Sequence, residues 1–380
     1  MKKNVLFIIP TLCRAGAEMQ VTDLLCGIDR ATFNVFLITF GSDLSLLERI
    51  KEFSLKHENY KRKSKVDFSM AFKISKFIDN NEIDVIHSSL QIALLFAWLG
   101  RMFSKRQPPI INVLHKTANR NLKEFYLEKL VYQWPMRACK KIICVCKSQE
   151  NFWCSQFPFM KSKTDVIYNG VNTTSFDSRK FDNDGRELRL HMDVPKDSQI
   201  ISCIAGFRIE KNHGVLIEAF ERLCSINNNV FLVLAGDGPE RQRIEAIVKQ
   251  KNLKEKICFL GRIDDVRSLL AASSLSVLAS NAIETFSIAM LESMAMKCPV
   301  ITTDIGGHKE AVIPGVTGEV VPINDIDALT EALKKCLNDI TALNKMGERA
   351  RNKVVEMFSL SLMLEKTEEA LLEVCESQKK

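Results

Sequence analysis

Two carboxylates, Glu284 and Glu292, stand eight residues apart in a segment whose pattern predicts a strand, a loop and a helix. Residues 275–278 form the short apolar run of a buried parallel strand, and residues 288–295 carry apolar side chains at helical spacing. A loop that enters a helix in this way favours an anion such as a diphosphate. Glu292 could accept hydrogen bonds from ribose hydroxyls, and Glu284 could reach a sugar beyond the diphosphate. Two glutamates at this spacing also occur by chance on many helices.

Arg208 and Lys211 carry the positive charge that a diphosphate requires. They follow a predicted strand at 200–205 and precede a helix that begins near His213, so we expect them at the ligand-facing end of a parallel sheet. Arginine binds phosphate oxygens as a planar fork, and lysine binds them as a point charge. Solvated loop charges without a ligand are the alternative interpretation.

A histidine and a glycine occupy comparable places in the first half of the chain. His115 ends a predicted strand at 110–114, where the carboxyl end of a parallel strand faces the ligand crevice, although a single histidine is more often structural. Gly16 follows a predicted strand at 4–9 and would let the backbone approach a phosphate or an acceptor. No Gly-x-Gly-x-x-Gly motif accompanies it, which disfavours a dinucleotide-dependent dehydrogenase.

Strands and helices that alternate along the whole chain must position these residues. The chain has 380 residues, of which 46% are hydrophobic and 26% charged, and this is typical of a soluble protein with two domain cores. The alternation predicts an α/β protein with doubly wound parallel sheets. An acidic, irregular stretch at 176–197 is interpreted as the linker. The expected parts are an N-terminal domain at 1–175, a C-terminal domain at 176–357 and a final helix at 358–380.

Several classes of protein are disfavoured by composition. Twelve cysteines lie mostly singly along the chain, which indicates free thiols in a reducing compartment. The longest apolar run, residues 90–103, is shorter than the roughly 20 residues of a membrane-spanning helix, and the apolar run before Pro10 is too short for the hydrophobic region of a signal peptide. Two Asp-x-Asp sequences, at 182–184 and 325–327, are interpreted as helix caps rather than metal ligands. We therefore expect a cytoplasmic protein without a metal site.

Charge is distributed unevenly between the two halves. Residues 1–175 carry a net charge of +11 and residues 176–380 a net charge of −4. A predicted helix at 120–141 mixes lysines and arginines with aromatic residues, a combination suited to an anionic lipid interface, and no nucleic-acid recognition motif accompanies it. We expect peripheral, reversible membrane association and no nucleic-acid partner. An ordinary surface helix is the alternative.

The order of several short motifs resembles that of the family 4 retaining glycosyltransferases, which have the GT-B fold. These motifs span nearly the whole chain and are Gly16-Ala17-Glu18, His115, Asn169-Gly170-Val171, Glu210-Lys211-Asn212, Gly236 to Pro239, Phe259 to Gly261, Glu284-x7-Glu292 and Gly306-Gly307-x-x-Glu310. The resemblance implies two facing Rossmann-like domains with a cleft between them and a C-terminal helix that crosses back to the first domain. It also implies a nucleotide-sugar donor in the second domain, an acceptor in the first, and no metal or other cofactor.

The resemblance further implies residue roles. Glu292 would bind the ribose hydroxyls and Glu284 the transferred sugar, while Lys211 and Arg208 would bind the diphosphate and stabilise the leaving nucleotide. His115 would contact the donor sugar from the first domain. Further donor-binding positions would be Gly16, Gly206, Gly261, Ile263, Thr285, Phe286, Ser287 and Ile288.

The chain departs from the family pattern at several of these positions. Ala15 stands where the family often has a glycine, and Gly206 where it often has an arginine, so we expect Arg208 to take over that role. Thr285 and Ser287 replace common glycines, which brings a Cβ close to the phosphates. Either hydroxyl could compensate by donating a hydrogen bond.

Together these features predict a retaining, metal-independent hexosyltransferase. The donor would be a UDP-hexose or a UDP-N-acetylhexosamine in preference to a GDP-sugar, and the acceptor a glycan or lipid-linked saccharide in surface polysaccharide or lipopolysaccharide biosynthesis. Two alternatives are a non-catalytic GT-B partner subunit and a nucleotide-sugar epimerase of GT-B architecture. Donor turnover with and without an acceptor distinguishes the three.

Overall fold

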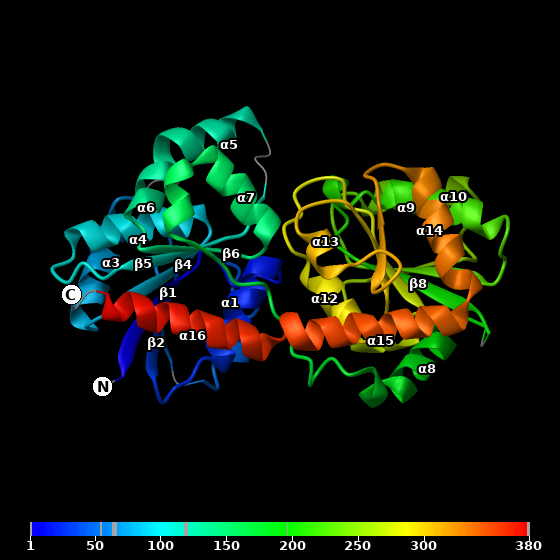
Figure 1. Ribbon diagram of the computed structural model, residues 1–380, viewed down its shortest axis with the longest axis horizontal. Helices are drawn as coiled ribbons and strands as arrows, with labels where there is room; N and C mark the ends of the chain where they lie inside the picture. Colours follow the sequence, from blue (N-terminus) through cyan, green and yellow to red (C-terminus); the bar gives the residue numbers. More distant parts are fainter. Residues whose placement is uncertain (1, 54, 63–66, 118–120, 196, 378–380) are drawn as a thin grey trace. The chain divides into compact units, whose positions relative to one another are not determined.

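Two units, each built around its own parallel sheet, make up the chain (Figure 1). The computed structural model describes residues 2–53, 55–62, 67–117, 121–195 and 197–377. Unit 1 contains residues 1–170 and 360–380, and unit 2 contains residues 171–359. Both units are α/β with strand order reversing near the middle of the sheet, which confirms the predicted doubly wound class.

The sheet of unit 1 has the order β3-β2-β1-β4-β5-β6-β7, and all of its pairs are parallel. Its strands are β1 (Lys3–Ile8), β2 (Phe33–Thr39), β3 (Leu55–Asn59), β4 (Val85–Ser89), β5 (Ile110–Leu114), β6 (Lys141–Cys144) and β7 (Thr164–Val166). The chain moves outward from β1 to β3 and then returns to β4 beside β1. The switch point of this sheet therefore lies between β1 and β4.

Helices pack on this sheet and enclose a core that includes the buried side chains of Phe77, Phe96 and Trp153. The helical segments are α1 (Gly16–Gly27), α2 (Leu47–Ile50), α3 (Ser69–Asn80), α4 (Gln91–Phe103), α5 (Leu122–Leu127), the π-helical turn η1 (Glu128–Tyr132), α6 (Gln133–Ala138), α7 (Lys147–Gln156), the 3-10 turn η2 (Pro158–Ser162) and α16 (Leu360–Glu376). The helix expected at 120–141 is present as an uninterrupted helical stretch from Leu122 to Ala138, but it contains the π-helical turn η1 and the chain leaves the helix after Ala138 rather than after Lys141. Arg120 lies outside the described residues, as does part of the basic stretch at 60–65.

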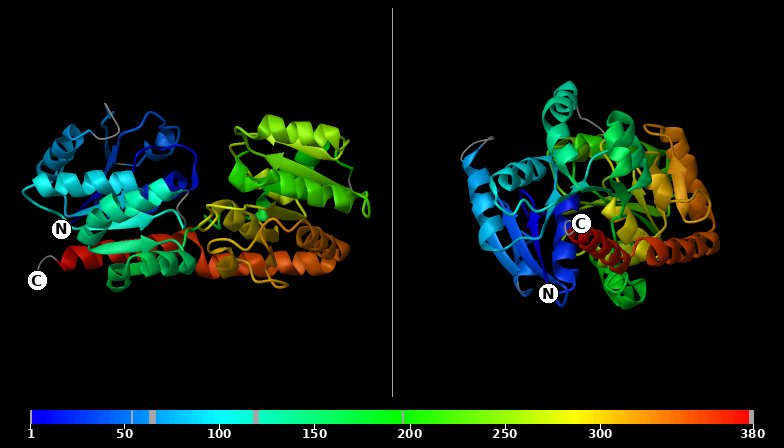
Figure 2. Two further views of the ribbon diagram at one scale, coloured as in Figure 1. Left: turned by 90° about the horizontal axis from the view of Figure 1, so that it is seen from above. Right: turned by 60° about the vertical axis from the view of Figure 1, so that its left-hand side comes forward.

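The last helix, α16, belongs to unit 1 although the chain reaches it only after completing unit 2 (Figure 2). Its Glu368 Oε1 accepts a hydrogen bond of 2.8 Å from the Asp29 backbone N–H. Glu373 Oε2 lies 2.5 Å from Lys141 Nζ. A side chain at Gly27 would collide with Leu364, so α16 packs closely on the end of α1. The return of the final helix to the first unit agrees with the implied fold.

The sheet of unit 2 has the order β10-β9-β8-β11-β12-β13, again with all pairs parallel. Its strands are β8 (Gln199–Ile204), β9 (Val230–Ala235), β10 (Ile257–Gly261), β11 (Leu275–Leu278), β12 (Val300–Thr303) and β13 (Gly318–Val321). Its helical segments are η3 (Ser178–Lys180), α8 (Asp182–His191), η4 (Ile209–Lys211), α9 (His213–Cys224), α10 (Arg241–Gln250), α11 (Arg267–Ala272), α12 (Ile288–Ala295), α13 (His308–Ala311), α14 (Ile326–Asn338) and α15 (Ile340–Met357). The switch point lies between β8 and β11.

Residues 176–197 are not the irregular linker that composition predicted. They include η3 and α8, and Leu188 and Met192 pack against a core cluster of unit 2. Three of the acidic residues of this stretch, Asp182, Asp184 and Glu187, lie exposed on α8. The unit boundaries fall at 170/171 and 359/360, whereas the sequence placed them at 175/176 and 357/358.

The two Asp-x-Asp sequences occupy helix starts. Asp325 Oδ1 accepts a hydrogen bond of 2.8 Å from the Ala328 backbone N–H and so caps α14. Asp182 and Asp184 lie in the first turn of α8, whose N-cap is Phe181, so the expected capping role at 182–184 was wrong. Among the described residues, no helix combines the length and the hydrophobicity needed to cross a bilayer.

Candidate functional site

The loops after β8 and β11 bring most of the predicted residues together at the switch point of unit 2. The two strands are neighbours in the sheet although they are far apart in sequence, and their carboxyl ends open toward the same edge. The Asn281 backbone N–H donates a hydrogen bond of 2.9 Å to the Glu210 carbonyl oxygen, which ties the two loops together. The first loop carries Arg208 and Lys211, and the second carries Glu284.

An ion pair between Lys211 and Glu284 joins these loops. Lys211 Nζ donates to Glu284 Oε1, and Ser280 Oγ donates to the same oxygen at 3.0 Å. Glu284 is only 9% exposed. Burial alone would raise the pKa of its carboxyl, but the charge of Lys211 and the hydrogen bonds from Lys211 and Ser280 together lower the pKa below its usual range. Glu284 is therefore ionised at neutral pH.

A glycine turn after β12 supports the Glu284 loop from the other side. Gly306 has φ of +54°, and a Cβ there would lie 2.5 Å from the carbonyl oxygens of both Glu284 and Thr285. The Gly307 backbone N–H donates to the Thr285 carbonyl oxygen at 2.7 Å. This turn accepts only glycine at 306, since any side chain would push the Glu284 loop out of place.

His308 follows this turn and is fully buried. Its Nδ1 lies 2.6 Å from Thr302 Oγ1. Burial lowers the pKa of the His308 imidazole, and the Glu284 charge only partly opposes that shift. The site thus holds a buried neutral histidine close to a buried ion pair.

Backbone strain is concentrated in the same loop. Ile283, directly before Glu284, has φ of +56°, which is an outlier for a β-branched residue. Such a conformation costs roughly 1–3 kcal/mol and persists only where the surroundings enforce it. The fold therefore places Glu284 at an energetic cost.

The start of α12 adds positive potential next to this loop. Ser287 is the N-cap, and its Oγ accepts a hydrogen bond of 3.4 Å from the Met290 backbone N–H. A hydroxyl that accepts this bond can still donate its own proton. The backbone N–H group of Ile288, the first residue of α12, belongs to the positive end of the helix dipole. Glu292 lies in the second turn of α12 and is half-buried.

The remaining donor-binding positions of unit 2 lie at the same end of the sheet. Gly206 lies two residues after the end of β8, and the Gly261 carbonyl oxygen at the end of β10 accepts a hydrogen bond of 2.8 Å from the Gly236 backbone N–H. Ile263 lies two residues after Gly261 and is half-buried. The Phe286 ring is buried and packs edge-on against Phe358, with ring centroids 5.2 Å apart, so its side chain stabilises unit 2.

The loop that carries the two cations is held by neighbouring glycines. A Cβ at Gly236 would lie 2.1 Å from the Ala205 carbonyl oxygen, so the turn after β9 packs directly on this backbone. Phe207 N donates to the Asp237 carbonyl oxygen at 3.0 Å. Arg208 itself is exposed, and its Nη1 lies 4.0 Å from Glu210 Oε1. It is therefore not committed to a strong ion pair.

Two predicted residues belong to unit 1. Gly16 is the exposed first residue of α1, behind the switch-point strand β1. His115 directly follows β5, and burial together with the charge of His87 lowers its pKa to about 3. His115 is consequently neutral at physiological pH. The strand end is fixed next to it, because Trp153 Nε1 and Gln149 Nε2 donate to the Lys116 carbonyl oxygen at 2.8 and 3.0 Å.

Sequence reasoning missed four contributors to the site, which are Ser280, Ile283, Thr302 and His308. Ser280 and His308 follow the adjacent strands β11 and β12, so the rule that ligands bind at strand ends near a switch point could have found them. The strain at Ile283 leaves no signal in a single sequence.

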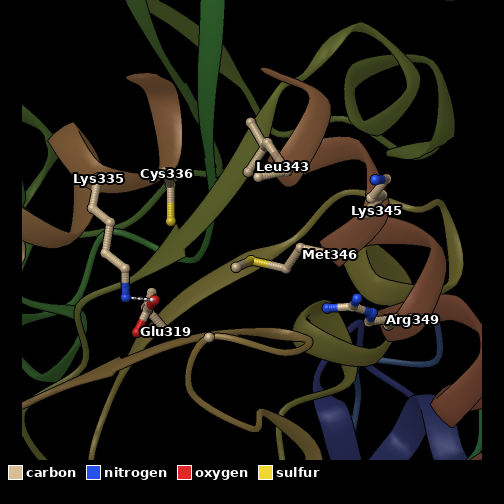
Figure 3. Close-up of a pocket in the computed structure, with 9 residues that line it drawn as sticks. Glu319, Lys335, Cys336, Leu343, Lys345, Met346 and Arg349 are labelled. Atoms are coloured by element: carbon tan, nitrogen blue, oxygen red, sulfur yellow. Dashed lines mark hydrogen bonds and ion pairs between the residues drawn. The ribbon is translucent and has the colours of Figure 1, made fainter. Parts of the chain in front are cut away.

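A separate cavity of about 330 Å³ lies between β13, α14 and α15 (Figure 3). Lys335 Nζ and Glu319 Oε1 form an ion pair of 2.7 Å in it, and Leu343 and Met346 supply apolar walls. None of the residues predicted from sequence lines this cavity. It adjoins the edge strand rather than the switch point, and it is not part of the candidate site.

Comparison with known proteins identifies the family. The sequence model described as Glycosyltransferase Family 4 matches residues 14–175, and that described as Glycosyl transferases group 1 matches residues 186–353. An uncharacterized glycosyltransferase of Methanocaldococcus jannaschii is 30% identical over 285 residues, covering 74% of this chain and 73% of that protein. The chain belongs to the family 4 glycosyltransferases.

Other relatives of this glycosyltransferase have more specific names. The N-acetyl-alpha-D-glucosaminyl L-malate synthase of Bacillus anthracis is 27% identical over 295 residues, which are 77% of this chain and 75% of that protein. The N-acetylgalactosamine-N,N'-diacetylbacillosaminyl-diphospho-undecaprenol 4-alpha-N-acetylgalactosaminyltransferase of Campylobacter jejuni is 26% identical over 369 residues, covering 93% of this chain and 94% of that protein.

Solved structures confirm the GT-B fold. A glycosyltransferase from Rickettsia africae has a TM-score of 0.87 at 23% identity and covers 98% of both chains. HepE of Anabaena in complex with UDP has a TM-score of 0.85 at 21% identity, covering 98% of this chain and 100% of that one. At these identities the likeness establishes the fold of the glycosyltransferase, and residue roles remain predictions.

The Lys211→Met variant tests whether the ion pair holds the site together. Removing the cation leaves the Glu284 carboxylate buried and unpaired, so we expect a loss of about 3–5 kcal/mol in the free energy of unfolding at neutral pH. Because the folded pKa of Glu284 is lowered, this contribution is present above its unfolded pKa and is lost as the pH falls through the folded one. Urea denaturation at pH 7 and pH 4 measures both effects.

The double variant Lys211→Met/Glu284→Gln removes the unpaired charge and should recover most of the lost stability at pH 7. Lys334→Met is the control, since the side chains of Lys334 and its partner Glu331 are both largely exposed to solvent, and it should cost much less. Equal stability of Lys211→Met and the wild type would contradict the importance of the pair.

Proposed function

We propose that this glycosyltransferase is a retaining, metal-independent hexosyltransferase that uses a nucleotide sugar, with a UDP-sugar favoured. The observation that carries the proposal is the pairing of Lys211 with Glu284 at the switch point of unit 2. A cation, a buried carboxylate and the N-terminus of α12 meet where a diphosphate sugar would bind. Glu292 on the same helix would accept hydrogen bonds from the ribose hydroxyls.

In this proposal the bond between the anomeric carbon and the diphosphate oxygen breaks, and its electron pair leaves with the nucleotide. Lys211, Arg208 and the helix N-terminus stabilise the negative charge that develops on the diphosphate. The acceptor oxygen bonds to the anomeric carbon on the face that the diphosphate leaves, and its proton passes to the departing phosphate. Glu284 is ionised and already accepts two hydrogen bonds, so it suits the binding of sugar hydroxyls better than proton donation.

The comparisons support a UDP-sugar and a lipid-linked or glycan acceptor. The structure of HepE of Anabaena contains UDP, and the name of the Campylobacter jejuni relative contains a diphospho-undecaprenol acceptor. By analogy we place this enzyme in surface polysaccharide or lipopolysaccharide biosynthesis in the cytoplasm. The Bacillus anthracis relative is named for L-malate, which would be a small soluble acceptor. The liposome experiment below therefore distinguishes a membrane-bound acceptor from a soluble one.

The face formed by α5, η1 and α6, here called the α5–α6 face, favours acceptor recruitment at a membrane. Leu130 is 67% exposed and Trp134 is 57% exposed, an unusual exposure for large apolar side chains. Exposed Lys123 and Lys129 lie on the same segment. Lys141, which was also expected on this face, instead pairs with Asp165 and Glu373. The combination of apolar and basic side chains suits an interface with anionic lipid.

Donor turnover tests the reaction class directly. We expect transfer from a UDP-hexose or a UDP-N-acetylhexosamine to continue in EDTA and the product to keep the anomeric configuration of the donor. A panel of nucleotide sugars with undecaprenyl-diphosphate-linked acceptors, followed by NMR of the product, measures both. Activity that EDTA abolishes and Mn²⁺ restores would refute metal independence, and an inverted anomer would refute retention. Donor consumption without any acceptor would favour the epimerase alternative.

Glu292→Ala should weaken the binding of UDP about 10- to 100-fold while the protein stays folded. The reason is that a hydrogen bond to a charged acceptor contributes about 1.5–3 kcal/mol. Isothermal titration calorimetry measures the affinity, and Glu348→Ala on α15 is a matched control because it removes an exposed carboxylate elsewhere in unit 2. Wild-type affinity in Glu292→Ala would rule out its contact with the nucleotide.

Flotation with liposomes tests the α5–α6 face. The enzyme should bind anionic vesicles at low salt, should bind neutral vesicles weakly, and should be released as salt screens the charges. Leu130→Ser/Trp134→Ser should reduce binding several-fold. Leu190→Ser is the control, since Leu190 is 75% exposed on α8 of unit 2. Failure to bind anionic vesicles at low salt would favour a soluble acceptor.

A further inference from the structure

His308 belongs to the same buried cluster as the Lys211–Glu284 ion pair, but nothing in the proposed reaction uses it. It begins α13 after β12, the strand next to β11. Gly306 and Gly307, immediately before it, contact the backbone of Glu284 and Thr285. The histidine ring is thus anchored to the same turn that holds the Glu284 loop in place.

One ring nitrogen of His308 has a partner and the other has none among the described residues. Nδ1 lies 2.6 Å from Thr302 Oγ1, whereas Nε2 is buried without a hydrogen-bond partner. Thr302 Oγ1 also lies 3.4 Å from the Leu278 carbonyl oxygen, so the hydroxyl can donate either to that oxygen or to Nδ1. The neutral ring can therefore carry its single proton on either nitrogen. A second proton can bind to the other nitrogen without breaking a hydrogen bond of Nε2, which has none within the described part of the chain.

The charges around His308 determine whether it takes up that proton. Lys211 opposes protonation, and Glu284 and Asp304 favour it. Asp304 is half exposed and pairs with Lys309 at 2.6 Å, so its influence is weakened by solvent and by that cation. The balance thus depends mainly on Lys211 and Glu284, whose opposite charges compensate each other while they are paired.

A bound diphosphate would change that balance, because the Lys211 ammonium would then interact with two anions, the diphosphate and the Glu284 carboxylate. Each contact of Nζ with a phosphate oxygen weakens its compensation of the buried Glu284 carboxylate. An uncompensated buried carboxylate is strongly unfavourable, so another positive charge must approach it or the carboxylate must be protonated. His308 is a titratable side chain of the cluster whose protonation the Glu284 charge favours.

We propose that His308 is a positioning residue that binds a proton from solvent when a nucleotide diphosphate engages Lys211. The proton adds to the free ring nitrogen, no other bond forms or breaks, and the imidazolium then compensates Glu284 in place of the lysine. Glu284 thereby keeps its charge and its position while Lys211 binds the diphosphate. This inference rests on the proposed function, since it requires that Lys211 bind the diphosphate of the donor.

The consequence is a defined pH dependence of nucleotide affinity. The pKa of His308 rises on binding, so the extra affinity is complete below the pKa of the free enzyme and is lost as the pH rises through the pKa of the complex. Between these two values the affinity changes by up to tenfold per pH unit. The ionisation of the nucleotide's own phosphate contributes equally in the wild type and in a His308 variant.

Calorimetric titration of the full chain with UDP, in buffers of low and high ionisation enthalpy, measures the number of protons taken up. His308→Gln keeps a hydrogen-bonding side chain but cannot be protonated, and we expect it to lose up to one proton of uptake per site. His213→Gln is the matched control, because His213 is also buried and also influenced by Lys211, but it stacks on Phe207 at 4.3 Å and does not compensate Glu284. It should keep the uptake of the wild type.

Equal uptake in the wild type and in His308→Gln, or loss of uptake in His213→Gln instead, would overturn the inference. If His308→Gln fails to fold, NMR titration of the His308 ring in the wild type replaces it, and a ring pKa that UDP does not raise overturns the inference equally. Absence of UDP binding by the wild type would instead overturn the proposed function, and the two failures are therefore distinguishable.

Discussion

The cost of keeping a carboxylate out of water is the constraint on which the site of unit 2 depends. Glu284 is almost completely buried, and its charge is tolerable only because Lys211 and Ser280 both bind Oε1. The lysine comes from the loop after β8 and the glutamate from the loop after β11, so the pair forms only when these strands are neighbours. A buried ion pair adds little net stability compared with an apolar pair of the same volume. Its presence at a switch point is consistent with the ligand-binding role proposed for this site.

Local backbone exceptions support this pair and occur beside it. Ile283 adopts a left-handed conformation directly before Glu284, and Gly306 fits against the carbonyl oxygens of Glu284 and Thr285 because it lacks a side chain. Regular strands and helices then fix both ends of the strained loop, through β11 on one side and α12 on the other. The strain is stored where the chemistry is proposed and is compensated by the packing of the sheet.

The overall fold was predictable because its signals are local. Apolar runs, glycine turns and amphipathic helices occur in the same order in sequence and in structure, and the motif order indicated the family. The errors came from tertiary contacts that no local pattern contains. The π-helical turn at 128–132 accompanies the burial of Glu128 against Lys116, 2.8 Å away. Helix α8 was predicted to be a linker because its sequence is mainly acidic and polar, and only a few apolar residues, among them Leu188 and Met192, pack against the core of unit 2. His308 acquires its importance only from strand order, which places β12 beside β11.

The candidate site residues of the two units differ in charge. This difference bears on which unit could stabilise the charged leaving group in a glycosyl transfer. His115 of unit 1 has a pKa of about 3, so at physiological pH it can offer a hydrogen bond but no positive charge. In the proposed reaction the charge of a departing diphosphate would instead be compensated by unit 2, where Lys211, Arg208 and the N-terminus of α12 lie together at one end of the sheet. The same reasoning explains why unit 2 needs a buried anion. Glu284 holds the Lys211 side chain in the site before any ligand arrives, so that the cation is positioned before the diphosphate binds.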